Sequence, residues 1–124
     1  MTSRKKILIV DDSPLIVKRL LTMLEDLPDV EWIKHAGNFH DALEQMEASK
    51  PGILLLDINL PDKSGIELLR TCKESNPEVK VIMITNQAND HYRKLCFSLG
   101  ADYFIDKSKE FELIADKIAL IQSR

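Results

Sequence analysis

Polar side chains suited to phosphate chemistry stand directly after four short apolar runs of this sequence. The runs and the residues that follow them are 7–10 before Asp11 and Asp12, 53–56 before Asp57, 81–84 before Thr85, and 103–105 before Asp106 and Lys107. Short continuous apolar runs are typical of strands in a parallel sheet that helices cover on both faces. Because such sheets bind ligands beyond the carboxyl ends of their strands, we expect three carboxylates, a hydroxyl group and a lysine to gather at one edge.

The charge of this expected cluster indicates a bound cation. Three carboxylates at one sheet edge repel each other, and Lys107 supplies a single positive charge. Mg²⁺ prefers a few carboxylate ligands completed by water, whereas zinc favours histidine and thiolate ligands, which are missing from this set. The alternative is that these acids only cap helices and solubilise loops. Two adjacent acids, a third acid, a threonine and a lysine at four strand ends argue against that alternative.

A carboxylate beside Mg²⁺, with a hydroxyl group and an ammonium group nearby, can act as a nucleophile toward phosphorus. Positioning and cations supply most of the catalysis in such a displacement. Asp57 is the predicted nucleophile because it follows the central strand, whereas the adjacent pair Asp11 and Asp12 suits metal binding. Lys107 and Thr85 suit two of the phosphoryl oxygens.

Strands and helices alternate along the whole sequence. The predicted helices begin at the caps Ser13 and Asn38, at the capping box of Ser64 and Glu67, near Asp90 and near Lys109, and the last two end near Leu99 and Gln122. The apolar stripe expected in the first helix contains Leu15, Ile16, Leu20, Leu24 and Leu27. Right-handed crossovers then favour an α/β fold, a (βα)5 doubly wound parallel sheet of five strands in the flavodoxin-like order 2-1-3-4-5.

Length, charge and hydropathy limit the classes of protein to which this chain can belong. Its 124 residues and 14.2 kDa predict a single domain over 1–124 with no output domain. The net charge of −3 argues against nucleic-acid binding. No apolar stretch reaches the ~20 residues of a membrane span, and there is no signal-peptide core, so we expect a cytoplasmic protein that does not bind membranes. Cys72 and Cys96 fit small core residues better than a disulfide or zinc site.

The combined spacing of these residues resembles the receiver domain of two-component response regulators over essentially the whole chain. The residues that carry the resemblance are Asp11 and Asp12, Asp57, the segment 61–65, Thr85, Gly100 and Ala101, and Lys107. Each piece alone is weak, but the combination is highly specific. The resemblance implies that Asp57 accepts a phosphoryl group from a sensor histidine kinase or a phosphotransfer protein. The signal then passes to a downstream protein partner or to the next carrier in a phosphorelay.

The resemblance also implies a metal site. Mg²⁺ is the implied cofactor, bound directly by Asp12 and Asp57, through water by Asp11, and through the backbone carbonyl of Asn59. Lys107 is implied to pair with the acyl phosphate. Catalysis by such a domain is limited to its own phosphorylation and dephosphorylation, with no separate substrate turned over.

A conformational switch follows from the same resemblance. Thr85 moves to hydrogen-bond the acyl phosphate, and Phe104 rotates inward into the space that Thr85 vacates. Three residues depart from the family pattern: Ser108 replaces the usual proline after the lysine, Asn86 replaces a small residue after the threonine, and Phe104 replaces the more frequent tyrosine. Ser108 is then a candidate cap for the last helix. None of these departures removes a phosphorylation residue.

Other functions fit the residues less well. The acidic segment 11–14 would repel the phosphate of FMN, which disfavours a flavodoxin proper. The segment 57–59 resembles the nucleophile loop of haloacid-dehalogenase-type phosphatases, but the second acid is missing and the segment follows the third strand instead of the first. No P-loop pattern occurs. A constitutive adaptor that is never phosphorylated is the remaining non-catalytic alternative.

Helical geometry predicts a partner surface on the last two helices. Phe97 points away from the core stripe of its helix, and Leu113 and Leu120, seven residues apart, lie together on one side of the last helix. Single exposed apolar residues are normal, but clustered ones suggest an interface. We expect Phe97, Leu113 and Leu120 to contact the downstream partner, with Arg93 and Lys94 on the polar rim. The expected protein is a monomer or a weak dimer.

Overall fold

The computed structural model describes residues 4–86 and 88–121 and shows five strands that alternate with five helices. In chain order the elements are β1 (Lys5–Val10), α1 (Pro14–Leu24), β2 (Val30–Ala36), α2 (Phe39–Ser49), β3 (Ile53–Asp57), α3 (Gly65–Ser75), β4 (Lys80–Thr85), α4 (Asp90–Ser98), β5 (Tyr103–Asp106) and α5 (Leu113–Leu120). All strand pairs are parallel, and the order is β2-β1-β3-β4-β5. The predicted fold and strand order are therefore confirmed.

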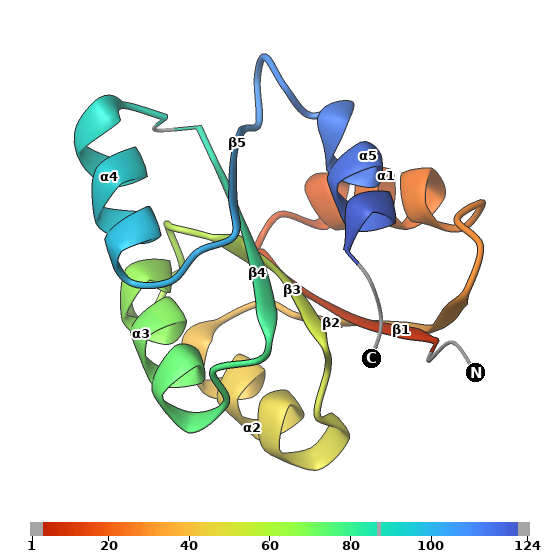
Figure 1. The fold of residues 1–124 in the computed structure, drawn as a ribbon, viewed down its shortest axis with the longest axis horizontal. Coiled ribbons are helices and arrows are strands. Elements are labelled where there is room, and N and C mark those ends of the chain that lie inside the picture. Colours follow the sequence, from red (N-terminus) through yellow and green to blue (C-terminus); the bar gives the residue numbers. More distant parts are fainter. Residues whose placement is uncertain (1–3, 87, 122–124) are drawn as a thin grey trace.

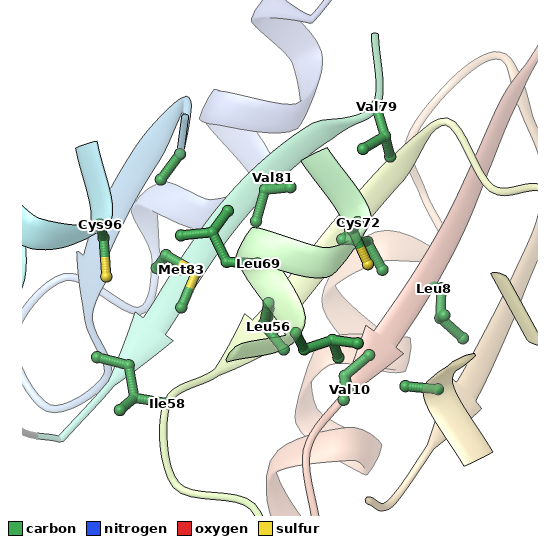
Figure 2. Close-up of a cluster of buried hydrophobic side chains, with 14 of the residues drawn as sticks. Leu8, Val10, Leu56, Ile58, Leu69, Cys72, Val79, Val81, Met83 and Cys96 are labelled. Atoms are coloured by element: carbon green, nitrogen blue, oxygen red, sulfur yellow. The ribbon is translucent and has the colours of Figure 1, made fainter. Parts of the chain in front are cut away.

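Helices cover both faces of the sheet and enclose two apolar cores. Figure 1 shows α1 and α5 on one side of the sheet and α2, α3 and α4 on the other. Successive strand residues point to opposite faces, so Leu55 of the central strand enters the core beneath α1 and α5, and Leu56 enters the other core. Figure 2 shows this second core, where Leu69 and Cys72 of α3 pack over the sheet. Because every residue of β3 is buried, its sequence is a continuous apolar run that ends at Asp57.

The predicted helix caps are largely confirmed. The Ser13 hydroxyl accepts a hydrogen bond from Ile16 N at 3.3 Å, and Asn38 Oδ1 accepts one from Asp41 N at 2.7 Å. The Ser64 hydroxyl accepts from Ile66 N at 3.1 Å, but Glu67 does not complete a capping box. Its carboxylate instead lies 3.9 Å from the Arg70 guanidinium, one turn along α3.

The predicted apolar stripe of the first helix was partly wrong. Leu15 is 66% exposed, and Val17 joins the buried stripe of α1 with Leu20 and Leu24. Leu24 lies nine positions after Leu15, which is two and a half helical turns, so the two side chains leave opposite sides of the helix.

The last helix was predicted to start near Lys109, but α5 begins at Leu113. Residues 107–112 form turns, and Ser108 does not cap the helix, because its N-cap is Glu112. The predicted end at Gln122 lies outside the described residues, and Leu99 is the C-cap of α4. Within residues 4–86 and 88–121, no helix has the length and hydropathy needed to span a bilayer.

Candidate functional site

The sheet register brings the predicted site residues to one edge. Val10 of β1 is paired with Leu56 of β3, so Asp11, which follows β1, and Asp57, which ends β3, lie side by side. Thr85, at the end of β4, is paired with Asp106, at the end of β5. Lys107 follows, and its backbone N–H donates to Thr85 O at 2.9 Å. The four strand ends therefore converge as the sequence predicted.

One lysine joins two buried carboxylates at the centre of this edge. Lys107 Nζ lies 2.5 Å from Asp11 Oδ2 and 3.1 Å from Asp57 Oδ2. All three residues are buried, with exposed fractions of 0% for Asp11, 5% for Asp57 and 7% for Lys107. Asp12 is exposed, but its carboxylate lies within 4.8 Å of both other carboxylates. The acidic residues thus form a cluster that is buried on one side and open on the other.

Burial makes the ionised form of Asp57 unfavourable. Removal of the carboxyl group from water raises its pKa above the ordinary value of 3.8. The positive charge of Lys107 acts against this shift, and the negative charge of Asp11 adds to it. A hydrogen bond from Asn59 N to Asp57 Oδ1, at 3.3 Å, favours the ionised form. Ionised Asp57 is therefore held at a cost that its neighbours only partly offset.

The donor set fits a hard divalent cation. Three carboxylates face one ammonium group, so the cluster keeps an excess of negative charge. Asp11 Oδ2 is buried, and it forms an ion pair with Lys107 but no hydrogen bond to any residue that the structure describes. Buried anionic oxygens need a cation or a hydrogen-bond donor. An all-oxygen set with an exposed member, Asp12, can hold Mg²⁺ and leave positions for water.

The loop after Asp57 is held in place by a glycine and by an isolated bridge. Gly65 N donates to Ile58 O at 2.6 Å, and Asn59 and Ser64 form an antiparallel bridge. A Cβ atom on Gly65 would collide with the backbone carbonyl of Asp57. Only glycine permits this close approach, so Gly65 fixes the position of the loop that follows Asp57 and contains Asn59.

Asp62 has a role that the sequence did not reveal. Its carboxylate accepts hydrogen bonds from Phe39 N at 2.8 Å and His40 N at 3.1 Å, at the N-terminus of α2. These hydrogen bonds hold the pKa of Asp62 below its ordinary value, and the bond from Phe39 N–H has the largest effect. The loop after β3 is thereby attached to α2. No local pattern indicates this contact, because the partners are 23 and 22 residues away.

The two predicted switch residues are both buried. Thr85 has an exposed fraction of 0% and Phe104 one of 4%. The Phe104 ring therefore already lies inward in this structure. Arg93 of α4 covers the ring, with its guanidinium carbon 5.0 Å from the ring centroid. Asn86, which follows Thr85, is exposed.

The expected partner residues are all exposed. The exposed fractions are 43% for Phe97, 39% for Leu113 and 64% for Leu120. Leu15 and Leu21 on α1 are also exposed, by 66% and 39%. The structure thus confirms that the three side chains are accessible.

Comparisons with known proteins agree with this geometry. Residues 7–119 match the family described as the response regulator receiver domain. A protein-glutamate methylesterase/protein-glutamine glutaminase of Clostridium acetobutylicum is 36% identical over 120 residues, which are 94% of this chain and 35% of that protein. The DNA-binding transcriptional activator DevR/DosR of Mycobacterium tuberculosis is 28% identical over 102 residues, 82% of this chain and 47% of that protein. The chain therefore spans about a third to a half of the length of these relatives.

Solved structures show the same fold. A CheY-like response regulator receiver domain protein from Methanospirillum hungatei has a TM-score of 0.84 and 32% identity, covering 94% of this chain and 91% of that one. The response regulator domain of Thermotoga maritima CheB has a TM-score of 0.80 and 26% identity, covering 95% and 91%. The fold, the matched residues and these relatives agree, and the chain belongs to the family of two-component response regulator receiver domains.

Proposed function

We propose that this receiver acts in the cytoplasm and accepts a phosphoryl group on Asp57 from the phosphohistidine of a sensor histidine kinase or phosphotransfer protein. The observation that carries the proposal is the buried ion pair between Lys107 Nζ and Asp57 Oδ2. An ammonium group held 3.1 Å from a carboxylate is placed to pair with a phosphoryl oxygen on the same carboxylate.

The reaction is an in-line displacement at phosphorus. A carboxylate oxygen of Asp57 forms the new O–P bond while the N–P bond of the phosphohistidine breaks, and the electron pair of that bond stays on the imidazole nitrogen. The product is an acyl phosphate on Asp57. Lys107 neutralises part of the charge on the phosphoryl oxygens. Thr85, buried at the end of the next strand, provides a hydroxyl group for another of these oxygens.

The acidic cluster is the proposed site of Mg²⁺. Asp12 and Asp57 would hold the ion directly, Asp11 through water, and Asn59 through its backbone carbonyl. Bound there, Mg²⁺ supplies positive charge to the phosphoryl oxygens. Asp12 suits this role because its carboxylate is exposed and close to that of Asp57.

A labelling experiment separates this proposal from a constitutive adaptor. The parent protein, with Mg²⁺ and a small donor such as acetyl phosphate or phosphoramidate, should become phosphorylated, and Asp57→Asn should not, because the amide is a poor nucleophile. Asp26→Asn is the matched control, since it makes the same change at an exposed carboxylate outside the acidic cluster. Intact-mass spectrometry measures the added phosphoryl group. Labelling of Asp57→Asn at the parental level would contradict the assignment of the nucleophile.

Asp57 should also make stability depend on pH. Its pKa is raised in the folded state, so folding favours the protonated form, and stability is lost as the pH rises above 3.8, the ordinary value. Without Mg²⁺, Asp57→Asn should therefore unfold at a higher urea concentration than the parent at pH 7. This advantage should shrink as the pH falls toward 3.8. An Asp57→Asn protein that is less stable than the parent at pH 7 would contradict this prediction. It would show that attraction to Lys107 stabilises the ionised Asp57 carboxylate by more than burial destabilises it.

The proposed switch is a shift between two conformations. Phosphorylation favours the state in which Thr85 is drawn toward Asp57 and Phe104 occupies its inward position. A downstream partner that prefers this state binds the phosphorylated protein more tightly. The Phe104 ring already lies inward beneath Arg93, which supports the proposal that the protein can adopt this state.

Removal of the threonine hydroxyl tests the switch. Thr85→Ala should still accept phosphate, because Asp57 and Lys107 remain. Phosphorylation of this variant should have much less effect on β5 than phosphorylation of the parent. Amide hydrogen exchange of residues 103–106 measures that coupling, and phosphorylation should slow exchange in the parent much more than in Thr85→Ala. An equal change in both proteins would exclude this route.

The proposed output surface contains Phe97, Leu113 and Leu120 with Arg93 and Lys94 on its rim. Phe97→Ala and Leu120→Ala should leave labelling of Asp57 intact. They should weaken the binding of a partner protein that was first isolated by its binding to the phosphorylated parent. Leu21→Ala is a matched control, because Leu21 is as exposed as Leu113 but lies on α1. Surface plasmon resonance gives the affinities. Parental affinity in both test variants would rule out this surface.

A further inference from the structure

The side chain of Asp106 accepts hydrogen bonds from the two residues that follow Lys107. Its Oδ1 atom accepts three hydrogen bonds, from Ser108 N–H at 2.9 Å, from the Ser108 hydroxyl at 2.7 Å and from Lys109 N–H at 3.3 Å. An aspartate that accepts a hydrogen bond from the N–H two residues later forms an Asx turn. The turn therefore encloses Lys107, and the Lys107–Ser108 peptide bond within it is trans.

Glu110 closes the same segment from the other end. Its Oε1 atom accepts from Asp106 N–H at 3.1 Å, and its own N–H donates to Asp106 O at 2.8 Å. Lys107 N–H donates in turn to Thr85 O at 2.9 Å. The Lys107 backbone is thus held by β4 and enclosed by the hydrogen bonds of Asp106 and Glu110.

Asp106 has the hydrogen bonds of an N-cap, because its side chain accepts from the N–H groups two and three residues later and its carbonyl accepts from Glu110 N–H, but the single turn that it caps is not α5. α5 begins at Leu113, and its N-cap Glu112 makes no side-chain capping hydrogen bond. The bonds of Asp106 end at Lys109, before the helix. At the centre of the segment is the one residue, Lys107, whose ammonium group reaches Asp11 and Asp57.

We propose that Asp106 and Glu110 are positioning residues that hold the Lys107 ammonium group at the Asp57 carboxylate. This inference rests on the proposed function, because the benefit is a faster transfer of the phosphoryl group to Asp57. Both acids act through the backbone, since the ion pairs of Lys107 in the described part of the chain are with Asp11 and Asp57. A lysine whose backbone is fixed loses less conformational freedom when its side chain reaches the acyl phosphate.

Three variants test the role of Asp106. Asp106→Ala removes the shared acceptor, Asp106→Asn keeps an oxygen acceptor and removes the charge, and Glu112→Ala removes a nearby exposed charge outside the network. With acetyl phosphate and Mg²⁺, Asp106→Ala should be labelled about tenfold more slowly than the parent, because ~1 Å of misplacement can cost ~10²-fold in rate. Asp106→Asn should restore most of the rate, and Glu112→Ala should match the parent.

A second measurement does not depend on phosphorylation. Deuterium exchange at the Lys107 amide, read by NMR without donor, should be faster in Asp106→Ala than in the parent and Asp106→Asn. Parental labelling or parental exchange in Asp106→Ala overturns the proposal. Slow labelling with a lowered melting temperature and no rescue by Asp106→Asn also overturns it, because it indicates a general folding defect. A parent protein that takes up no label contradicts the proposed function instead, while the exchange rates still show whether Asp106 holds Lys107.

Discussion

The structure depends most on the burial of two carboxylates against one ammonium group. Asp11 and Asp57 are withdrawn from water, and such groups are tolerated in a protein interior only when they are paired or bind a cation. Their partner, Lys107, comes 50 residues after Asp57. It reaches them because β4 and β5 continue the sheet from β3 and end at the same edge. The strand order therefore allows the charge of Lys107 to offset the charges of Asp11 and Asp57.

The loops around this charge cluster are held by side-chain hydrogen bonds, some between neighbours in the sequence and others between distant residues. Asp62 attaches the loop after β3 to the N-terminus of α2, and Asp106 closes the segment after β5. Gly65 lets the first of these loops pass close to the Asp57 carbonyl. Site residues on loops need such support, because loops are otherwise the least precise part of a fold. The site therefore combines rigid strand ends with two loops that acidic side chains fasten.

The sequence predicted the sheet and the polar groups at its edge because both follow from simple regularities. A buried parallel strand is a continuous apolar run, and its end is marked by the first polar residue, as at Asp57. The side of α1 that faces the core was predicted less well: Leu15 was grouped with Leu24, although nine positions along a helix place the two side chains on opposite sides.

The remaining differences arise from interactions that no pattern of apolar residues records. Phe111 is buried and continues the apolar stripe of α5 backward, which suggested an earlier helix start. In the structure the side chain of Asp106 instead caps a separate turn over residues 107–110, and α5 begins after it, at Leu113. The contact of Asp62 with α2 is tertiary, so it appears only once α2 and the loop after β3 are brought together.

The position of Phe104 shows how an event at Asp57 can reach α4. Phe104 and Lys107 lie on one short segment, and Arg93 of α4 covers the Phe104 ring. A cation–π contact contributes about 0.5–2 kcal/mol, depending on its exposure to water. Since about 1.4 kcal/mol changes an equilibrium tenfold, a contact of this strength biases two conformations without locking either one. The same lysine that balances the buried carboxylates is therefore linked through one strand to a contact whose strength suits a shift between two conformations.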